Sequence, residues 1–249
     1  MDLGLADRVA LVTGASSGIG RAIAAELVAE GARVAVASRS AERIGAAAVE
    51  IGARGFVHDS ADLEATGALV DHVEAELGPV DVLVCNTGGP PAGADPLGFT
   101  PEQWDDAHRA LVLAPMALIQ RVVPGMRDRG GGRILNVASS SVREPIAALM
   151  LSNAERSATL AAFKTLAREL ASDGITVNSV LPGRIATERV FGLAGSREGA
   201  ERAAAEQVPA GRLGMAEELA AAAAFLCSAR ASYVTGTALL VDGGLTRSV

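Results

Sequence analysis

The chain has 249 residues, of which 49% are hydrophobic and 20% charged, a composition that disfavours intrinsic disorder. Its net charge of −7 and its aromatic content of 3% disfavour a nucleic-acid partner, because phosphates find no basic stripe and bases find no stacking platform. The first residues lack the pattern of a signal peptide, and no stretch approaches an uncharged apolar span of about 18 residues. We therefore expect a cytoplasmic protein without a membrane partner.

Short β-branched runs alternate with longer alanine-rich stretches of helical period along the whole chain. The expected strands are residues 8–13, 33–38, 55–59, 80–85, 133–139, 174–181 and 237–244. The expected helices are residues 18–30, 41–51, 62–77, 101–128, 151–172 and 215–228. Continuous apolar strands separated by helices predict a parallel sheet of about seven strands with helices on both faces. With right-handed crossovers, this is the α/β class with a doubly wound sheet, in one domain over residues 1–249.

Three features within these elements are more specific. Thr100 followed by Pro101 and Gln103 is typical of a capped helix start, and Pro115 predicts a bend further along the same helix. We expect residues 188–212 to form a mobile lid over a substrate. Their arginines could meet an anionic substrate, but acid–base pairs on a solvated helix are the favoured interpretation.

A glycine-rich turn, TGASSGIG, follows the first expected strand and opens the first expected helix. Gly14 allows a sharp turn, Gly18 allows close approach of a ligand to the backbone, and Gly20 allows the helix to pack on the sheet. The N–H groups and the positive dipole end of such a helix favour a phosphate. A plain tight turn is the alternative. The turn predicts a pyrophosphate site formed by Gly14, Ser16, Ser17, Gly18, Ile19 and Gly20.

Further motifs follow in order: HDS (58–60), CNTGG (85–89), GRILNVASS (132–140), ITVNSVLPGRIAT (175–187) and VTGTALLVDGG (234–244). With these motifs the chain resembles the short-chain dehydrogenase/reductase family over essentially its whole length. The resemblance implies a Rossmann-like fold, a nicotinamide dinucleotide and a small carbonyl or alcohol substrate, with acyl-thioester ketones among the candidates. It also implies a homo-oligomer, either a dimer or a tetramer.

The resemblance assigns further cofactor contacts to the carboxyl ends of the strands. Asp59 would accept a hydrogen bond from the adenine amino group, with Ser60 beside it. Asn86 and Gly88 would form the turn after the fourth strand, which could also stabilise the sheet. The segment along the nicotinamide would comprise Pro182, Gly183, Ile185 and Thr187.

The end of the second strand, Ser38-Arg39, bears on the choice of cofactor. An NAD site usually has an acid near this point for the ribose 2′-hydroxyl, whereas a hydroxyl followed by a guanidinium suits a 2′-phosphate. We therefore expect NADP, with NAD as the alternative. Arg39 could also be only a solvated residue before the next helix.

The reaction centre departs from the resemblance. The family uses a serine, a tyrosine that donates a proton, and a lysine that holds the nicotinamide ribose and lowers the tyrosine pKa. Ser139 matches the serine, but the tyrosine and lysine positions fall on Ser152 and Arg156. A guanidinium stays charged and an aliphatic hydroxyl is a poor acid, so neither replaces a phenol. Leu111 stands where the family often has a relay asparagine.

Other residues offer little replacement chemistry. Tyr233, the only tyrosine, is expected to be structural, and Lys164, the only lysine, to be a solvated helix residue. Glu144 is a weak candidate acid, and Cys85 and Cys227 lack metal-ligand spacing, so we expect buried thiols and no metal. Two functions stay open: an oxidoreductase with an atypical centre built from Ser139, Ser152 and Arg156, or a dinucleotide-binding protein that has lost turnover and acts as a sensor or assembly partner.

Overall fold

The computed structural model describes residues 2–248, which form one seven-stranded sheet in the order β3-β2-β1-β4-β5-β6-β7. Every strand pairing in it is parallel. The strands are β1 Val9–Thr13, β2 Arg33–Ser38, β3 Arg54–Val57, β4 Val82–Cys85, β5 Gly132–Val137, β6 Ile175–Pro182 and β7 Ala238–Val241. The predicted doubly wound parallel sheet is confirmed.

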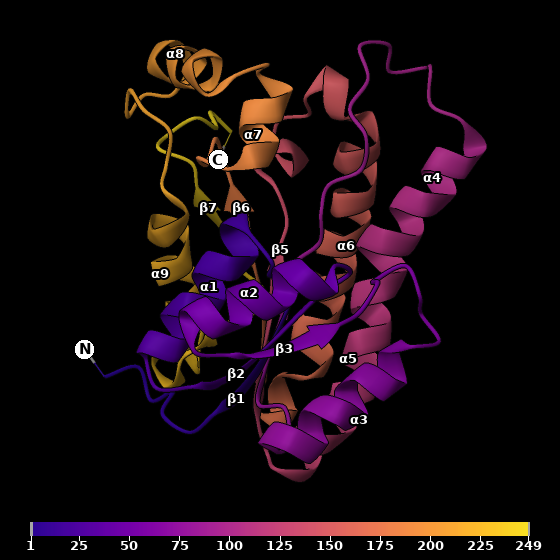
Figure 1. Cartoon of the computed structure of the whole chain (residues 1–249), viewed down its shortest axis with the longest axis vertical. Coiled ribbons are helices and arrows are strands. Elements are labelled where there is room, and N and C mark those ends of the chain that lie inside the picture. The colour runs from indigo at the N-terminus through magenta and orange to yellow at the C-terminus, as the bar shows by residue number, and fades with distance from the viewer. Residues whose placement is uncertain (1, 249) are drawn as a thin grey trace.

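The described part of the chain contains nine α-helices. They are α1 Gly18–Ala29, α2 Ala41–Ile51, α3 Thr66–Leu77, α4 Pro101–His108, α5 Ala114–Asp128, α6 Met150–Glu169, α7 Glu188–Leu193, α8 Arg197–Gln207 and α9 Ala216–Cys227. α1, α2 and α9 pack on one face, and α3, α5 and α6 pack on the other (Figure 1). Each face thus buries one apolar cluster against the strands, as both-face coverage requires.

The start of α3 corrects the prediction of a helix from residue 62. The helix begins at Thr66, because the Asp62 carboxylate accepts a hydrogen bond from the Ala65 N–H at 3.1 Å and holds a preceding turn. Short polar side chains commonly divert the backbone in this way.

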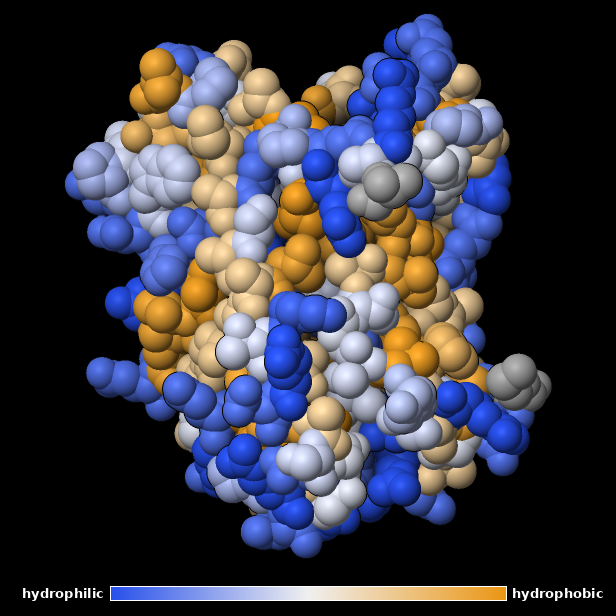
Figure 2. Space-filling view, turned by 180° about the vertical axis from the view of Figure 1, so that it is seen from behind, coloured by the Kyte–Doolittle hydropathy of each residue, from blue (hydrophilic) through white to orange (hydrophobic). Residues whose placement is uncertain are grey.

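The order of the strands places a crevice at the carboxyl ends of β1 and β4, where the chain changes sides of the sheet. α7 and α8 lie over this end of the molecule, which is the top of Figure 1. Figure 2, seen from behind, shows a notch at the same upper end. Ligands of open α/β sheets bind at such switch points, so the functional site is sought there.

The long helical stretch 101–128 begins with the predicted capping box. Thr100 Oγ1 accepts from the Gln103 N–H, and the Gln103 side chain accepts from the Thr100 N–H. The expected bend at Pro115 is a π-helical turn over Arg109–Leu113, directly before the proline. Proline lacks the N–H that would bond to the carbonyl of Leu111, which explains why the regular ladder breaks here.

The helical stretch Pro101–Asp128 is long enough, and with a mean hydropathy of 1.2 apolar enough, to cross a membrane. This differs from the expectation that no stretch comes close to such a span. The same helix packs Leu118, Ile119, Val122 and Met126 into the core cluster beneath the sheet. A core helix meets the same criterion, so hydropathy alone carries no membrane assignment.

The segment 188–212, where one solvated helix was the favoured interpretation, contains two short helices, α7 and α8. Thr187 caps α7 by accepting from the Val190 N–H, and Ser196 caps α8 by accepting from the Gly199 N–H. Both cap residues are followed by an acid in the first helical turn, a signal that was present in the sequence. A small apolar cluster of Ala200, Ala204, Val208 and Leu213 lies beneath them.

Candidate active site

The glycine turn is fixed by space as well as by backbone conformation. Gly14 and Gly18 have φ angles of +59° and +57°, a region that favours glycine. A Cβ on Gly20 would lie 2.5 Å from the Gly14 carbonyl oxygen and 2.6 Å from Asn86 Nδ2. The three glycines of the motif are therefore required by the fold of the turn.

Asn86 ties this turn to the neighbouring strand. Its side-chain Nδ2 donates to the carbonyls of Thr13 (3.3 Å) and Gly14 (3.0 Å). The Thr13 hydroxyl in turn donates to the Asn86 carbonyl at 2.9 Å. Asn86 therefore has the sheet-stabilising role that was one of its two predicted roles. By contrast, a Cβ on Gly88 would meet nothing within 4 Å, so space does not demand glycine there.

The N-terminus of α1 keeps donors available. Ser17 is the N-cap residue, yet its side chain caps no N–H of the helix. Ser16 and Ile19 are partly exposed beside it. Thr187 lies against Gly18, because a Cβ on that glycine would be 3.3 Å from Thr187 Cγ2. The residue that precedes α7 therefore lies against the glycine turn.

The segment that leads to Thr187 passes closely over the sheet. A Cβ on Gly183 would lie 2.6 Å from Asp242 Cβ, so a side chain there would collide with the loop after β7. Pro182 is buried at the end of β6, and Ile185 is buried and pairs with Gly214. The predicted nicotinamide segment is thus held at the same end of the sheet as the glycine turn.

The ends of β2 and β3 present the remaining predicted cofactor residues. Ser38 Oγ is buried without a hydrogen-bond partner in the described chain, and Arg39 is exposed next to it. Asp59 is exposed and accepts from the Ala61 N–H at 3.0 Å, and Ser60 is partly buried. A buried hydroxyl without a partner is costly, which fits a position that a ligand completes.

A cavity of about 300 Å³ that the sequence did not suggest lies between β3 and α3, beside Asp59. His58, Asp62 and His72 are among the residues that line it. Burial lowers the pKa of His58, and the charges of Asp59 and Asp62 act in the opposite direction.

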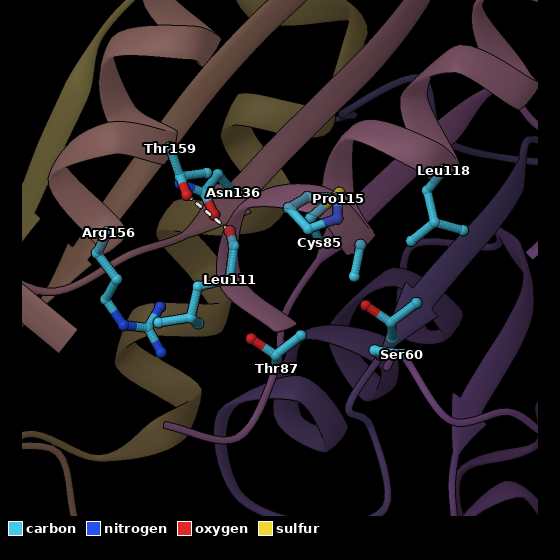
Figure 3. A pocket seen from close by; sticks show the side chains of 11 residues that line it. Ser60, Cys85, Thr87, Leu111, Pro115, Leu118, Asn136, Arg156 and Thr159 are labelled. Carbon is cyan, nitrogen blue, oxygen red and sulfur yellow. Dashed lines mark hydrogen bonds between the residues drawn. The ribbon is translucent and has the colours of Figure 1, made fainter. Parts of the chain in front are cut away.

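A second, narrow cavity of about 10 Å³ lies where β1, β4 and β5 meet α5 and α6. Figure 3 shows Arg156 reaching into it from α6, with Thr87, Leu111 and Asn136 around it. Asn136 is 5% exposed, and its Nδ2 has no hydrogen-bond partner within residues 2–248. The cavity therefore presents hydrogen-bond donors, and its volume corresponds to about one water molecule.

Arg156 is anchored at the rear of this cavity. Its Nε donates to Ser152 Oγ at 3.2 Å, and its Nη1 donates to the Val137 carbonyl at 2.7 Å. Burial, and to a smaller extent the positive charge of Arg189, lower the pKa of Arg156 to about 10. Arg156 nevertheless stays charged at neutral pH, so it can hold an anion or a developing oxyanion but cannot shuttle a proton.

The two serines of the predicted centre differ in access. Ser139 is partly exposed, and its Oγ accepts from the Ser141 N–H at 3.1 Å, so its hydroxyl proton is free to donate. Ser152 is 5% exposed and lies behind Arg156. Helical i, i+4 spacing therefore brings Ser152 and Arg156 together as expected, but Ser152 orients the guanidinium instead of facing an open pocket.

Arg189, on α7, joins this helix to the loop after β4. Its Nη1 and Nη2 donate to the carbonyls of Gly89 and Pro90, each at 3.0 Å. Burial lowers the pKa of Arg189. Arg197 fits the expectation of acid–base pairs on a solvated helix, because it pairs with Glu201 at 3.1 Å on the surface of α8.

Thr159 supplies a hydrogen bond that the irregular part of the long helix lacks. Its hydroxyl is 2.6 Å from the Leu111 carbonyl, which lacks a helical partner because Pro115 has no N–H (Figure 3). The sequence showed that Leu111 cannot supply a polar side chain, but it did not show that its carbonyl is occupied by Thr159.

The alternative catalytic candidates lie elsewhere. Tyr233 is fully exposed (101%) and packs on nothing in this chain, which does not support its predicted structural role. Lys164 donates to the Gly236 carbonyl at 2.8 Å, so it is a tether to the loop before β7. Glu144 accepts from the N–H groups of Arg247 and Ser248, so it holds the C-terminal segment. Burial raises the pKa of Cys85 to about 12, consistent with a thiol in the core.

The fold and the glycine turn define a dinucleotide-binding α/β protein. The family model described as enoyl-(acyl carrier protein) reductase matches residues 14–246. The 3-oxoacyl-[acyl-carrier-protein] reductase FabG of Salmonella typhimurium is 38% identical over 245 residues, covering 96% of this chain and 97% of the relative. An acetoacetyl-CoA reductase of Rhizobium meliloti is 38% identical over 242 residues, covering 95% and 98%.

A solved structure gives the same result. L-sorbose reductase from Gluconobacter frateurii, in complex with NADPH and L-sorbose, is 36% identical, with a TM-score of 0.94 and full coverage of both chains. The present chain belongs to the short-chain dehydrogenase/reductase family, whose parallel sheet and phosphate turn it shares.

Proposed function

We propose that the chain is an NADP(H)-dependent oxidoreductase that interconverts a carbonyl and an alcohol. The observation that carries this proposal is the uncapped N-terminus of α1, at a glycine turn whose geometry forbids side chains. The relatives named as carbonyl reductases, and the NADPH held by the sorbose reductase, support it. A homo-oligomer is part of the proposal, and the apolar middle of the face in Figure 2 suits a contact between copies.

The residues present suit the cofactor in three places. The turn from Gly14 to Gly20 would hold the pyrophosphate through backbone N–H groups. Ser38 and Arg39 would hold a 2′-phosphate, for which the unpartnered hydroxyl and the free guanidinium are suitable donors. Asp59, Asn86 and the segment ending at Thr187 would border the adenine and the nicotinamide. When bound, the nicotinamide supplies or accepts a hydride.

The reaction centre that we propose is atypical. Ser139 would orient the substrate oxygen by donating a hydrogen bond to it from its hydroxyl group. Arg156 would stabilise negative charge on that oxygen as hydride reaches the carbon. Ser152 would act as a positioning residue, because it is buried and its Oγ accepts a hydrogen bond from Arg156.

The proton for the product alcohol would come from water held at the small cavity beside Asn136 and Arg156. The carbonyl carbon gains the hydride, and the oxygen gains one proton from this water. The water then recovers a proton from bulk solvent. General acid catalysis by a side chain is typically worth about 10²–10⁴-fold. We therefore expect slow turnover compared with a centre that contains a phenol.

A second candidate function is that of a dinucleotide-binding protein without turnover. One observation favours it: the only tyrosine is fully exposed, and the only lysine is bonded to a backbone carbonyl. To separate the two functions, NADPH is mixed with the protein and a panel that includes acetoacetyl thioesters and L-sorbose. Loss of absorbance at 340 nm supports the enzyme, whereas cofactor binding seen by fluorescence without consumption across the panel supports the binding protein.

The double variant Ser152→Tyr, Arg156→Lys tests the reaction centre directly. If the native pair only replaces a phenol and an amine, ketone reduction should rise by about 100-fold or more. Arg156→Lys alone is the matched control, because it changes the cation without adding a proton donor. An unchanged rate in a folded double variant that binds NADPH contradicts the proposed substitution of roles.

A further inference from the structure

Helix α7 reaches both sides of the crevice between β1 and β4. Thr187, its N-cap residue, lies against the glycine turn that follows β1, since a Cβ on Gly18 would be 3.3 Å from Thr187 Cγ2. Two residues later, Arg189 donates to the carbonyls of Gly89 and Pro90 in the loop that follows β4, each at 3.0 Å. Because these two loops border the switch point of the sheet, α7 spans the place where the dinucleotide is proposed to bind.

The contact on the β4 side depends on one side chain. The other hydrogen bonds of α7 in the described chain stay within residues 187–195. Val190 and Phe191 pack on the apolar cluster that includes residues of α8, so they hold α7 to its own segment and not to the loop after β4. Arg189 is therefore the residue whose hydrogen bonds fasten α7 across the crevice.

The acceptor side is fixed in place and shaped for this guanidinium. Asn86, three residues before Gly89, is bonded to the end of β1 and to the glycine turn. Further along the loop, the Gly93 N–H donates to the Ala148 carbonyl at 3.0 Å. A Cβ on Gly89 would collide with the guanidinium of Arg189, so glycine at this position lets the arginine lie directly on the backbone.

The base of the segment is held independently of Arg189. The Ala186 N–H donates to the Gly214 carbonyl at 2.8 Å, and the Gly214 N–H donates to the Arg184 carbonyl at 2.9 Å. Neither bond involves α7, so the helix can leave the loop after β4 without breaking them. The Arg189 side chain is also exposed enough for water to replace both carbonyls as acceptors. The contact is therefore releasable while the base of the segment stays in place.

We propose that Arg189 is a latch that holds α7 across the crevice, so that a dinucleotide enters and leaves only when the hydrogen bonds to Gly89 and Pro90 are broken. This rests on the proposed function only in that a dinucleotide binds in the crevice, and it does not depend on turnover. Arg189 is a positioning residue, because it acts through α7. A latch that closes the empty and the filled crevice alike slows entry and exit together, and it leaves the equilibrium affinity unchanged.

The rates of NADPH binding test the latch. Stopped-flow fluorescence gives the association and dissociation rate constants, and a titration gives Kd. Arg189→Gln should raise both rate constants by about tenfold and change Kd by no more than about twofold. Arg189→Lys should restore part of the slow exchange, since an ammonium group can donate to the same carbonyls.

A change on the acceptor side should have the same effect. The φ angle of Gly89 is not positive, so alanine fits its backbone and displaces the flexible side chain of Arg189. Gly89→Ala should therefore also speed NADPH exchange, and the double variant Arg189→Gln, Gly89→Ala should be no faster than either single variant. Two controls should leave both rates unchanged: Gly192→Ala, on α7 where a Cβ meets nothing within 4 Å, and Arg202→Gln, an exposed arginine of α8.

A measurement without nucleotide keeps the latch separate from the proposed function. In the empty chain, Arg189→Gln should speed hydrogen–deuterium exchange of the amides in residues 188–195 and leave the strands of the sheet unchanged. If NADPH does not bind at all, the proposed function fails, and this exchange still decides whether Arg189 holds α7 in place.

Three results would overturn the inference: unchanged binding rates in Arg189→Gln, additive effects of the changes at Arg189 and Gly89, or unchanged amide exchange in α7. Slower association with a weaker Kd would assign Arg189 to direct contact with a phosphate of NADPH, and it would also remove the latch. Faster NADPH exchange without NADPH consumption would uphold the latch and contradict the proposed turnover.

Discussion

The glycine turn and the Arg156 pocket lie at the same end of the sheet, but different forces hold them. The turn is fixed by backbone conformation and by contacts shorter than any side chain allows, as at Gly14 and Gly20. The pocket is fixed by a few polar contacts to Arg156. The turn therefore tolerates almost no change, whereas the pocket can change its chemistry while the fold persists.

The largest effect is expected when a methyl group is placed in the turn. Gly20→Ala puts a Cβ within 2.6 Å of both Gly14 O and Asn86 Nδ2, so the turn must shift. We expect a loss of about 1–3 kcal/mol in the free energy of unfolding. NADPH affinity should fall on the order of 100-fold. Urea unfolding and fluorescence titration measure the two quantities.

Gly45→Ala is the matched control for that change. Gly45 lies in α2, and a Cβ there meets nothing within 4 Å. Alanine should stabilise the helix by about 0.5–1 kcal/mol and leave NADPH binding unchanged. Equal behaviour of the two variants would contradict the steric account of the turn.

Thr159, which lines the Arg156 pocket, provides a test of the polar contacts there. Thr159→Val keeps the shape of the side chain but leaves the Leu111 carbonyl without its partner at 2.6 Å. Because that carbonyl is buried and Pro115 cannot serve it, we expect a loss of about 1–3 kcal/mol in the free energy of unfolding. The measurement is urea denaturation followed by circular dichroism.

Thr165→Val provides the comparison on the same helix. The Thr165 hydroxyl likewise donates to a backbone carbonyl, but Thr165 is exposed. Its partner is the Ala161 carbonyl, four residues earlier, at 3.1 Å. Its replacement should change stability by no more than about 0.5 kcal/mol. A similar loss in both variants would show that the π-helical turn does not depend on Thr159.

A smaller effect, on the affinity for NADPH but not for NADH, is expected at the end of β2. Arg39→Gln removes an exposed charge at the end of β2, beside the unpartnered hydroxyl of Ser38. We expect NADPH affinity to fall about tenfold while NADH affinity is unchanged, since only the former carries a 2′-phosphate. Arg43→Gln, on the exposed side of α2, is the control. A parallel loss for both cofactors would remove Arg39 from the choice between them.

The sequence predicted the turn well because its determinants are local. Glycines at a strand-to-helix junction restrict the backbone within a few residues, and no distant contact is needed to recognise them. The same holds for the capping box at Thr100. Local patterns also predicted the alternation of strands and helices along the chain, and the structure confirms it.

The pocket, and the contact of α7 with the loop after β4, were less predictable because their determinants are distant. Nothing in the neighbourhood of Arg189 indicates that it grips Gly89 and Pro90. Pro115 signalled an irregular helix, but the hydroxyl that completes it comes from Thr159 on another helix. Ser152 was correctly paired with Arg156 by helical spacing, yet its burial depends on packing that spacing does not reveal.

The smallest expected effect concerns an exposed ion pair between Arg212, at the end of the segment 188–212, and Glu218. Arg212 donates two hydrogen bonds of 2.7 Å to Glu218 at the start of α9. The hydrogen bonds from Arg212, followed by that from the Met215 N–H, lower the pKa of Glu218 to about 2. An unfolded glutamate titrates near ~4.3, so this carboxylate stabilises the fold above that pH, and the contribution is lost as pH falls toward 2.

Glu218→Gln should therefore be less stable than the natural chain by a constant amount above about pH 5, and the difference should shrink as the pH is lowered below ~4.3. Unfolding curves in urea, recorded from pH 6 to pH 2.5, measure it. Glu217→Gln removes a neighbouring exposed carboxylate, and its curve should run parallel to that of the natural chain. A difference that grows on acidification would reverse the sign of the linkage and show that the hydrogen bonds from Arg212 do not hold the segment 188–212 against α9.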